Sequence, residues 1–218
     1  MKRFLYFLIF SLFLSCGKKK PTESLQKLFV EAASKRQQDT VDDTVSDFRK
    51  QLAAEALNII DPNVRYIPDY LAISYPNGDV PANTGVCTDV IVRAYRKIGI
   101  DLQKEVHEDM KINFNSYPKI WGLTKPDTNI DHRRVPNLET FFRRKGKELT
   151  VTQNANDYKT GALVTWMINN KMPHIGIVTN QLSIDGKRRL IVHNVGNGQV
   201  LEDCLFKYPI VGHFVFEG

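Results

Sequence analysis

Apolar positions recur at helical spacing in the first half of the chain and at strand spacing in the last third. The helical pattern predicts helices over residues 45–60 and 88–98, and a shorter helix that Asn137 caps and that stops near Gly146. Gly99 follows the second helix directly and is a usual residue after a helix C-terminus. Each helix is expected to bury one apolar face.

Strand-like patterns follow in the last third. Strands are expected over residues 162–168, 174–179, 189–195 and 210–216. Asp185-Gly186 is a turn signal and predicts a hairpin between the second and third of these strands. Prolines and glycines make the segments 66–85 and 101–136 expected loops. Helices followed by strands favour an α+β domain, with N-terminal helices packed on an antiparallel sheet.

The first residues have the pattern of an export signal. Lys2 and Arg3 precede an apolar run that is too short to span a membrane, and Ser15-Cys16-Gly17 follows it. We therefore expect residues 1–15 to be a signal peptide, Cys16 to be lipidated and residues 16–42 to be a polar tether to a domain at 43–218. The alternative is an ordinary signal cleavage site with Cys16 incidental. The first interpretation predicts an exported protein anchored to the membrane through lipid.

The net charge of the chain and its distribution limit the classes of ligand that the protein is expected to bind. The formal net charge of +6 falls to +4 once Lys2 and Arg3 are removed, and no long basic run interleaved with aromatic residues follows. We therefore expect no nucleic-acid ligand. His107, Glu108 and Asp109, even with His132, lack a metal-ligand spacing, so neither a metal nor another cofactor is expected. A monomer is expected.

Cys87 is the candidate nucleophile. It lies where a loop containing Gly85 enters a helix, and the free amides and dipole of a helix start favour the reactive thiolate. The alternative is a small buried cysteine that packs with the apolar face of that helix. Cys204, expected to be an inert buried thiol, could instead form a disulfide with Cys87, and composition does not decide between these possibilities.

Two histidines lie on the strands of the predicted hairpin. His174 precedes an apolar run, where a titratable side chain could act as the base for a thiol. The hairpin would bring His193 to the neighbouring strand, so His193, or Asn194, could orient His174. Either histidine could also be purely structural. The run Asp131-His132-Arg133-Arg134 could bind a substrate carboxylate, or it could be a solvated loop paired to nearby acids.

Several motifs together resemble a family of exported bacterial proteins, domain of unknown function 1287 (DUF1287). They are Gly85 to Val90 with Arg93 to Tyr95, Val106 to Met110, Asn129 to Leu138, His174 to Val178 and His193 to Gly196. That family is distantly similar to NlpC-type papain-like cell-wall peptidases. The resemblance implies a papain-like fold with Cys87 as nucleophile, His174 as base and acid, and His193 as the orienting group. It also suggests Tyr75 as the tyrosine before the cysteine. Independently of the resemblance, Asp89, His132, Arg133 and Arg134 are the expected substrate contacts.

The sequence departs from the NlpC-type pattern at Val86, at Thr88-Asp89 and at Gly161-Ala162. The resemblance implies hydrolysis of amide bonds, with peptidoglycan stem peptides as the natural envelope substrate. The alternatives are a non-catalytic envelope binding module on the same fold and a cysteine-dependent acyltransferase, which shares the acyl-enzyme intermediate.

Overall fold

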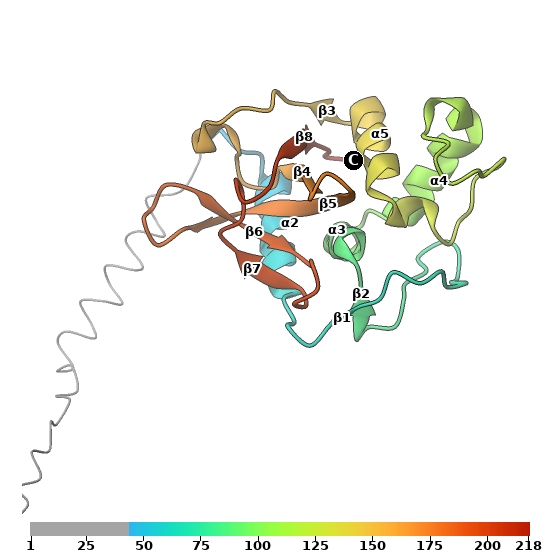
Figure 1. Cartoon of the computed structure of the whole chain (residues 1–218), viewed down its shortest axis with the longest axis horizontal. Helices are drawn as coiled ribbons and strands as arrows, with labels where there is room; N and C mark the ends of the chain where they lie inside the picture. The colour runs from blue at the N-terminus through green and yellow to red at the C-terminus, as the bar shows by residue number, and fades with distance from the viewer. Residues whose placement is uncertain (1–43) are drawn as a thin grey trace, which may run out of the picture. The chain divides into compact units, whose positions relative to one another are not determined.

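A six-stranded antiparallel sheet with the strand order β3-β8-β4-β5-β6-β7 is the centre of the fold (Figure 1). A computed structural model describes residues 44–218 of the chain. The strands of this sheet are β3 (Lys147–Glu148), β4 (Leu163–Ile168), β5 (Met172–Leu182), β6 (Arg189–His193), β7 (Val200–Glu202) and β8 (Ile210–Val215). A separate two-stranded parallel sheet joins β1 (Arg65–Tyr66) to β2 (Thr84–Gly85).

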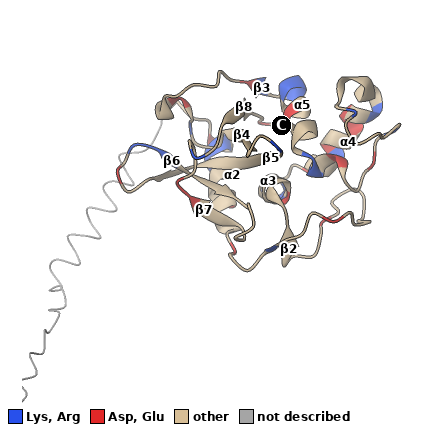
Figure 2. Cartoon of the chain, viewed as in Figure 1, with Lys and Arg blue, Asp and Glu red and all other residues tan. Residues whose placement is uncertain are grey.

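Within residues 44–218, four α-helices accompany the sheet. They are α2 (Asp47–Asn58), α3 (Cys87–Lys97), α4 (Leu102–Asn113) and α5 (Val135–Lys145). Short 3-10 helices are η1 (Phe114–Ser116), η2 (Asp131–Arg133) and η3 (Ala155–Asp157). In Figure 1, α2 crosses the sheet, α3 and α5 lie beside it, and α4 lies beyond them. Basic and acidic residues lie side by side along α4 and α5 (Figure 2).

The main core lies between the helices and one face of the sheet. The strands contribute Ile175, Ile177 and Val192, all fully buried, and α3 contributes Ile91 and Tyr95. Burying a large apolar side chain of this kind stabilises the fold by about 1.5–3 kcal/mol. The apolar stripe of α3 therefore fixes this helix, with Cys87 at its start, against β5.

A second, smaller core covers the other face of the sheet. Trp166, Val178 and Ile191 come from the strands, and Tyr158 and Leu205 come from the adjoining loops. Neighbouring residues along β5 thus alternate between two buried environments, as the pleat of a strand requires. The predicted α+β architecture, with helices packed on an antiparallel sheet, is confirmed.

Some element predictions were wrong. Residues 101–136 are not all loop, because α4 begins after Asp101, whose carboxylate accepts a hydrogen bond from the Gln103 amide at 3.2 Å. Helix α5 starts before Asn137, which is inside the helix, since Pro136 occupies a first-turn position that needs no amide hydrogen. The short strands β1, β2, β3 and β7 were not predicted, and β2 lies inside the segment 66–85 that was expected to be loop. The remaining helices and the four predicted strands are present, with bounds shifted by a few residues.

The expected signal peptide, the expected lipidation at Cys16 and the tether 16–42 lie outside the described residues. Residues 44–218 belong to one compact unit. Within this part of the chain, no helix is both long enough and apolar enough to cross a membrane.

Candidate active site

Cys87 is the first residue of α3, and the residues around it fix the start of the helix. Val86 is extended, and its amide donates to the Asp89 carboxylate at 2.6 Å. Just before it, Gly85 pairs with Tyr66 through the short parallel sheet. The helix therefore begins at a defined residue, and Cys87 is the first residue of its first turn.

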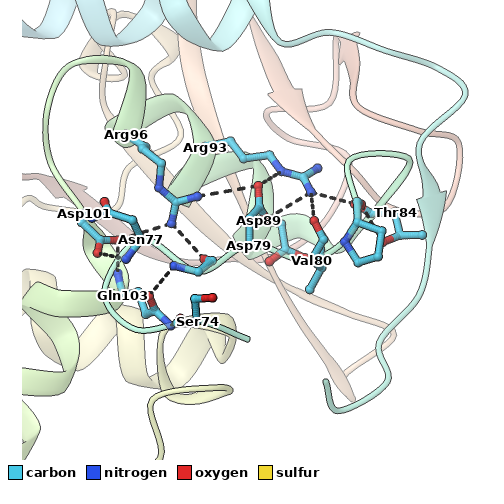
Figure 3. A network of polar contacts seen from close by, with 12 residues as sticks. Ser74, Asn77, Asp79, Val80, Thr84, Asp89, Arg93, Arg96, Asp101 and Gln103 are labelled. Atoms are coloured by element: carbon cyan, nitrogen blue, oxygen red, sulfur yellow. Dashed lines mark hydrogen bonds and ion pairs between the residues drawn. The ribbon is translucent and has the colours of Figure 1, made fainter. Parts of the chain in front are cut away.

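Arg93, one turn further along α3, holds the loop that leads to the cysteine. Its guanidinium donates to the Asp79 carboxylate at 3.0 and 3.1 Å and to the Thr84 carbonyl at 2.9 Å. It also donates to the side chain of Gln199 at 2.9 Å. Figure 3 shows the bonds of Arg93 to Asp79 and Thr84, together with Arg96, which donates to the Gly78 carbonyl at 3.0 Å. The loop before Cys87 is thus bonded to the outer side of α3.

Three donors surround the Cys87 sulfur: the amides of Ile175 and Thr88 and the hydroxyl of Tyr66. Each lowers the pKa of the thiol, as the start of a helix was expected to do. Burial is the larger effect, because the side chain is 3% exposed, and it raises the pKa of Cys87 to about 11, with Asp89 adding to the rise. The net effect is a raised pKa rather than the lowered one that a helix start favours, since the sequence reveals a helix start but not the depth of burial.

His174 lies in β5 directly opposite Trp166, with 5.8 Å between the ring centroids. Its Nε2 lies 2.8 Å from His193 Nδ1. Its Nδ1 is buried without a hydrogen-bond partner among residues 44–218. Burial, and next the nearby charge of His193, lowers the pKa of His174 to about 3. At neutral pH the site therefore holds a neutral imidazole and a neutral thiol.

The Cys87 sulfur meets β5 from the helix side, at the amide of the residue that follows His174. The predicted nucleophile thus contacts the strand that carries the predicted base, whereas the His174 ring itself lies on the Trp166 face of that strand. Asn194, the other residue considered for orienting His174, instead donates to the Gly85 carbonyl at 3.3 Å. It joins the end of β6 to the loop before Cys87.

His193 continues the hydrogen-bonded chain to β7. Its Nε2 lies 3.3 Å from Glu202 Oε2 and 3.6 Å from Cys204 Sγ. The antiparallel register pairs Ile177 with Val192 and His193 with Val200, so His174, His193 and Glu202 occupy one face of the sheet along a diagonal. We call these three residues the His–His–Glu chain. Sequence analysis missed Glu202, because β7 has three residues and too little alternation to be recognised as a strand.

Gly176 makes room for this chain. A Cβ atom built at Gly176 would lie 2.5 Å from Ile191 Cγ2 and 3.2 Å from His193 Cβ. Separations this short require neighbouring atoms to move, so only glycine fits here without shifting β6. The glycine in the His174-Ile175-Gly176 motif thus has a local steric reason.

The tyrosine at the cysteine is Tyr66, whereas the resemblance suggested Tyr75. Tyr75 is half-exposed, donates to Glu108 at 2.8 Å and packs edge-on against His107. Tyr66 is brought to Cys87 by the two-residue β1, whose pairing with β2 has no clear periodic signal in the sequence. A count of residues back from the cysteine therefore selected another tyrosine.

The other predicted substrate contacts are engaged within the protein. Arg133 and Asp89 form a two-pronged ion pair at 2.9 and 3.0 Å, with side chains 2% and 4% exposed. His132 is buried, and burial together with the nearby Arg133 charge lowers its pKa to about 4. Arg134 lies 3.8 Å from Asp131, and its guanidinium stacks 4.2 Å from the Trp121 ring. The structure thus gives this run a role in joining η2 to α3.

One set of described side chains could hold a metal ion: His193, Glu202 and Cys204, whose ligand atoms lie within 4.8 Å of one another. Burial raises the pKa of Cys204 to about 12, so without a metal this sulfur is a protonated thiol. Cys87 and Cys204 are both free cysteines, so no disulfide links them. Separately, a pocket of about 530 Å³ lies behind α3 and is lined by residues that include Arg93, Arg96 and Asp79, but not by Cys87 or His174.

The chain is similar to known proteins over most of its length. The family model described as Domain of unknown function (DUF1287) matches residues 53–216. The protein named Uncharacterized protein YijF from Escherichia coli (strain K12) is 47% identical over 163 residues, which cover 75% of this chain and 79% of that protein. Among solved structures, NlpC1 from Trichomonas vaginalis aligns with a TM-score of 0.39 and 14% identity, over 77% of this chain and 44% of that chain.

Proposed function

Since the chain belongs to the DUF1287 family, and since its Cys87 sulfur contacts the strand that carries His174, we propose that the protein is a cysteine hydrolase of amide bonds. The observation that carries the proposal is the contact between Cys87 and the Ile175 amide, beside a histidine whose Nδ1 has no partner among the described residues. His174 Nε2 is engaged by His193, so Nδ1 is the ring atom left to receive a proton.

In the proposed mechanism, the neutral Cys87 thiol and the neutral His174 imidazole react, and no thiolate is needed before the substrate binds. His174 Nδ1 takes the thiol proton through one bridging water as the Cys87 sulfur attacks the carbonyl carbon, and the Thr88 amide and Tyr66 hydroxyl are the donors available to the oxyanion. His174 then protonates the leaving amine, which gives an acyl-enzyme. Water, deprotonated by the same imidazole, releases the acid and restores the thiol.

The proposed substrate class comes from the proposed location. If residues 1–15 direct export and Cys16 carries lipid, a monomeric protein would be tethered at the envelope face of a membrane. Peptidoglycan stem peptides are the abundant amide substrates there. The buried resting state of Cys87 favours one alternative, a non-catalytic envelope binding module, and an acyltransferase would share every step up to the acyl-enzyme.

Purified peptidoglycan incubated with the full-length protein provides the test. Mass spectrometry of the soluble products should reveal new free amino and carboxyl termini, and Cys87→Ala and His174→Gln should each abolish them. His213→Gln is the matched control, because His213 is also a buried strand histidine but stacks on Tyr158, away from Cys87. Identical products from the unmodified protein and Cys87→Ala would refute the hydrolase. Products with the acyl group moved to an amine would indicate transfer.

A further inference from the structure

The Nε2 atom of His193 has two neighbours with opposite requirements. Glu202 Oε2, at 3.3 Å, is a carboxylate oxygen that can only accept, so it requires a proton on Nε2. Cys204 Sγ, at 3.6 Å, carries a hydrogen that it can donate, and this donation requires Nε2 to be unprotonated. One nitrogen of a neutral imidazole cannot satisfy both.

The choice at His193 determines the tautomer of His174, because one proton lies between His174 Nε2 and His193 Nδ1 at 2.8 Å. If His193 donates from Nε2 to Glu202, its Nδ1 must accept from His174 Nε2, and His174 Nδ1 is left bare. If Cys204 donates to His193 Nε2, the direction reverses and the proton of His174 moves to Nδ1. A His174 protonated on Nδ1 cannot take a proton there.

The carboxylate is the stronger partner. A hydrogen bond to an ionised group is about twice as strong as a neutral one, and a thiol is a weak donor. The charged groups at the Glu202 end of the His–His–Glu chain are Glu202, Lys207 and Asp203. Lys207 Nζ lies 3.6 Å from Glu202 Oε2, and Asp203 pairs with Arg188 at 2.6 Å. Glu202 is the one of these whose oxygen reaches His193.

We propose that Glu202 is a positioning residue that selects the tautomers of both histidines, and thereby keeps His174 Nδ1 free to act as the base for Cys87. This inference rests on the proposed function, but its first consequence, the location of two protons, can be measured without a substrate. Cys204 is the competing partner that takes over when Glu202 is removed.

The test uses the full-length protein with ¹⁵N-labelled histidine, whose long-range proton–nitrogen correlations identify each tautomer. In the unmodified protein, His174 and His193 should both carry the proton on Nε2. Glu202→Ala should move both protons to Nδ1, and Glu202→Ala with Cys204→Ala should remove the competing donor and give a mixture. Asp203→Ala is the matched control, because its carboxylate is next in sequence but pairs with Arg188.

Alkylation of Cys87 by iodoacetamide at pH 7.5, mapped by peptide mass spectrometry, gives the functional readout. Glu202→Ala should slow it about tenfold or more, the effect expected from losing one hydrogen bond to a charged group, and the added Cys204→Ala should restore part of the rate. A proton on Nδ1 of His174 in the unmodified protein would overturn the inference whether or not any variant folds. Unchanged tautomers in Glu202→Ala would overturn it too.

The two proposals fail separately. If the tautomers follow Glu202 but peptidoglycan is not cleaved, the positioning role stands and the hydrolase does not. If Cys87-dependent cleavage is equally fast with and without Glu202, the hydrolase stands and the positioning role does not.

Discussion

Replacing Arg133 by methionine should destabilise the protein rather than weaken substrate binding. The change removes the partner of a carboxylate that is 4% exposed and leaves the Asp89 charge inside the fold. Breaking a buried pair in this way costs about 3–5 kcal/mol. Asp89 keeps the Val86 amide at 2.6 Å and the positive end of the α3 dipole, so we expect a loss near the lower limit, about 3 kcal/mol.

Arg143 and Glu148 supply a matched control. They form the same two-pronged pair, with both contacts at 2.9 Å, but their side chains are 48% and 45% exposed. An exposed pair contributes up to about 1 kcal/mol, so Arg143→Met should cost no more than that. The difference between these two variants isolates the effect of burial at nearly constant geometry.

Urea unfolding followed by circular dichroism measures both costs. The double variant Asp89→Asn with Arg133→Met should be more stable than Arg133→Met alone, because it removes the uncompensated charge while the amide oxygen can still accept from Val86. Equal costs for Arg133→Met and Arg143→Met would refute the reasoning. A stable Arg133→Met with a raised KM would instead support the earlier expectation that this arginine binds substrate.

Two further predictions concern the sheet and the buried histidines. Gly176→Ala should cost about 1–3 kcal/mol in the same unfolding assay and slow Cys87 alkylation, because its Cβ would press on Ile191 and His193; unchanged values would contradict the steric role of Gly176. Lowering the pH from 7.5 to 5 should reduce the free energy of unfolding by about 2–3 kcal/mol, and a stability that is flat or rises towards pH 5 would contradict the neutral buried histidines. His174 and His132 have folded pKa values of about 3 and 4, so below pH 6.5 they gain protons mainly in the unfolded state, which lowers the free energy of unfolding. The pKa of Asp131 is raised to about 6 in the folded state, so its protonation offsets part of that loss of stability.

Periodicity predicted the elements that carry a strong one-sided pattern. Helix α3 and strands β4 to β6 are central, and their apolar residues face cores on which the whole fold depends. Helix α4 was missed although Leu102, Val106 and Met110 follow one another at helical spacing, because the prolines further along the same segment were taken to describe all of it. A proline disfavours a helix only at the residues next to it, and says nothing of residues about ten or more positions away.

The site was predictable where the chemistry is local and unpredictable where it depends on distant pairing. Cys87 at a helix start and the two strand histidines could be read from neighbouring residues. The Arg133–Asp89 pair, the Tyr66 contact and the Glu202 contact each join segments that are far apart in sequence or held by strands of two or three residues. The protonation of Cys87 also depends on burial, which is a property of the assembled core.

The diagonal course of the His–His–Glu chain over three strands makes its geometry a property of sheet register. A one-residue insertion within β6 would carry His193 to the opposite face, since side chains alternate along a strand. Extra residues at the Asp185-Gly186 hairpin would instead extend a loop and leave the paired strands as they are. Relatives of this protein should therefore tolerate length changes at that turn while keeping a fixed spacing from His193 to Glu202.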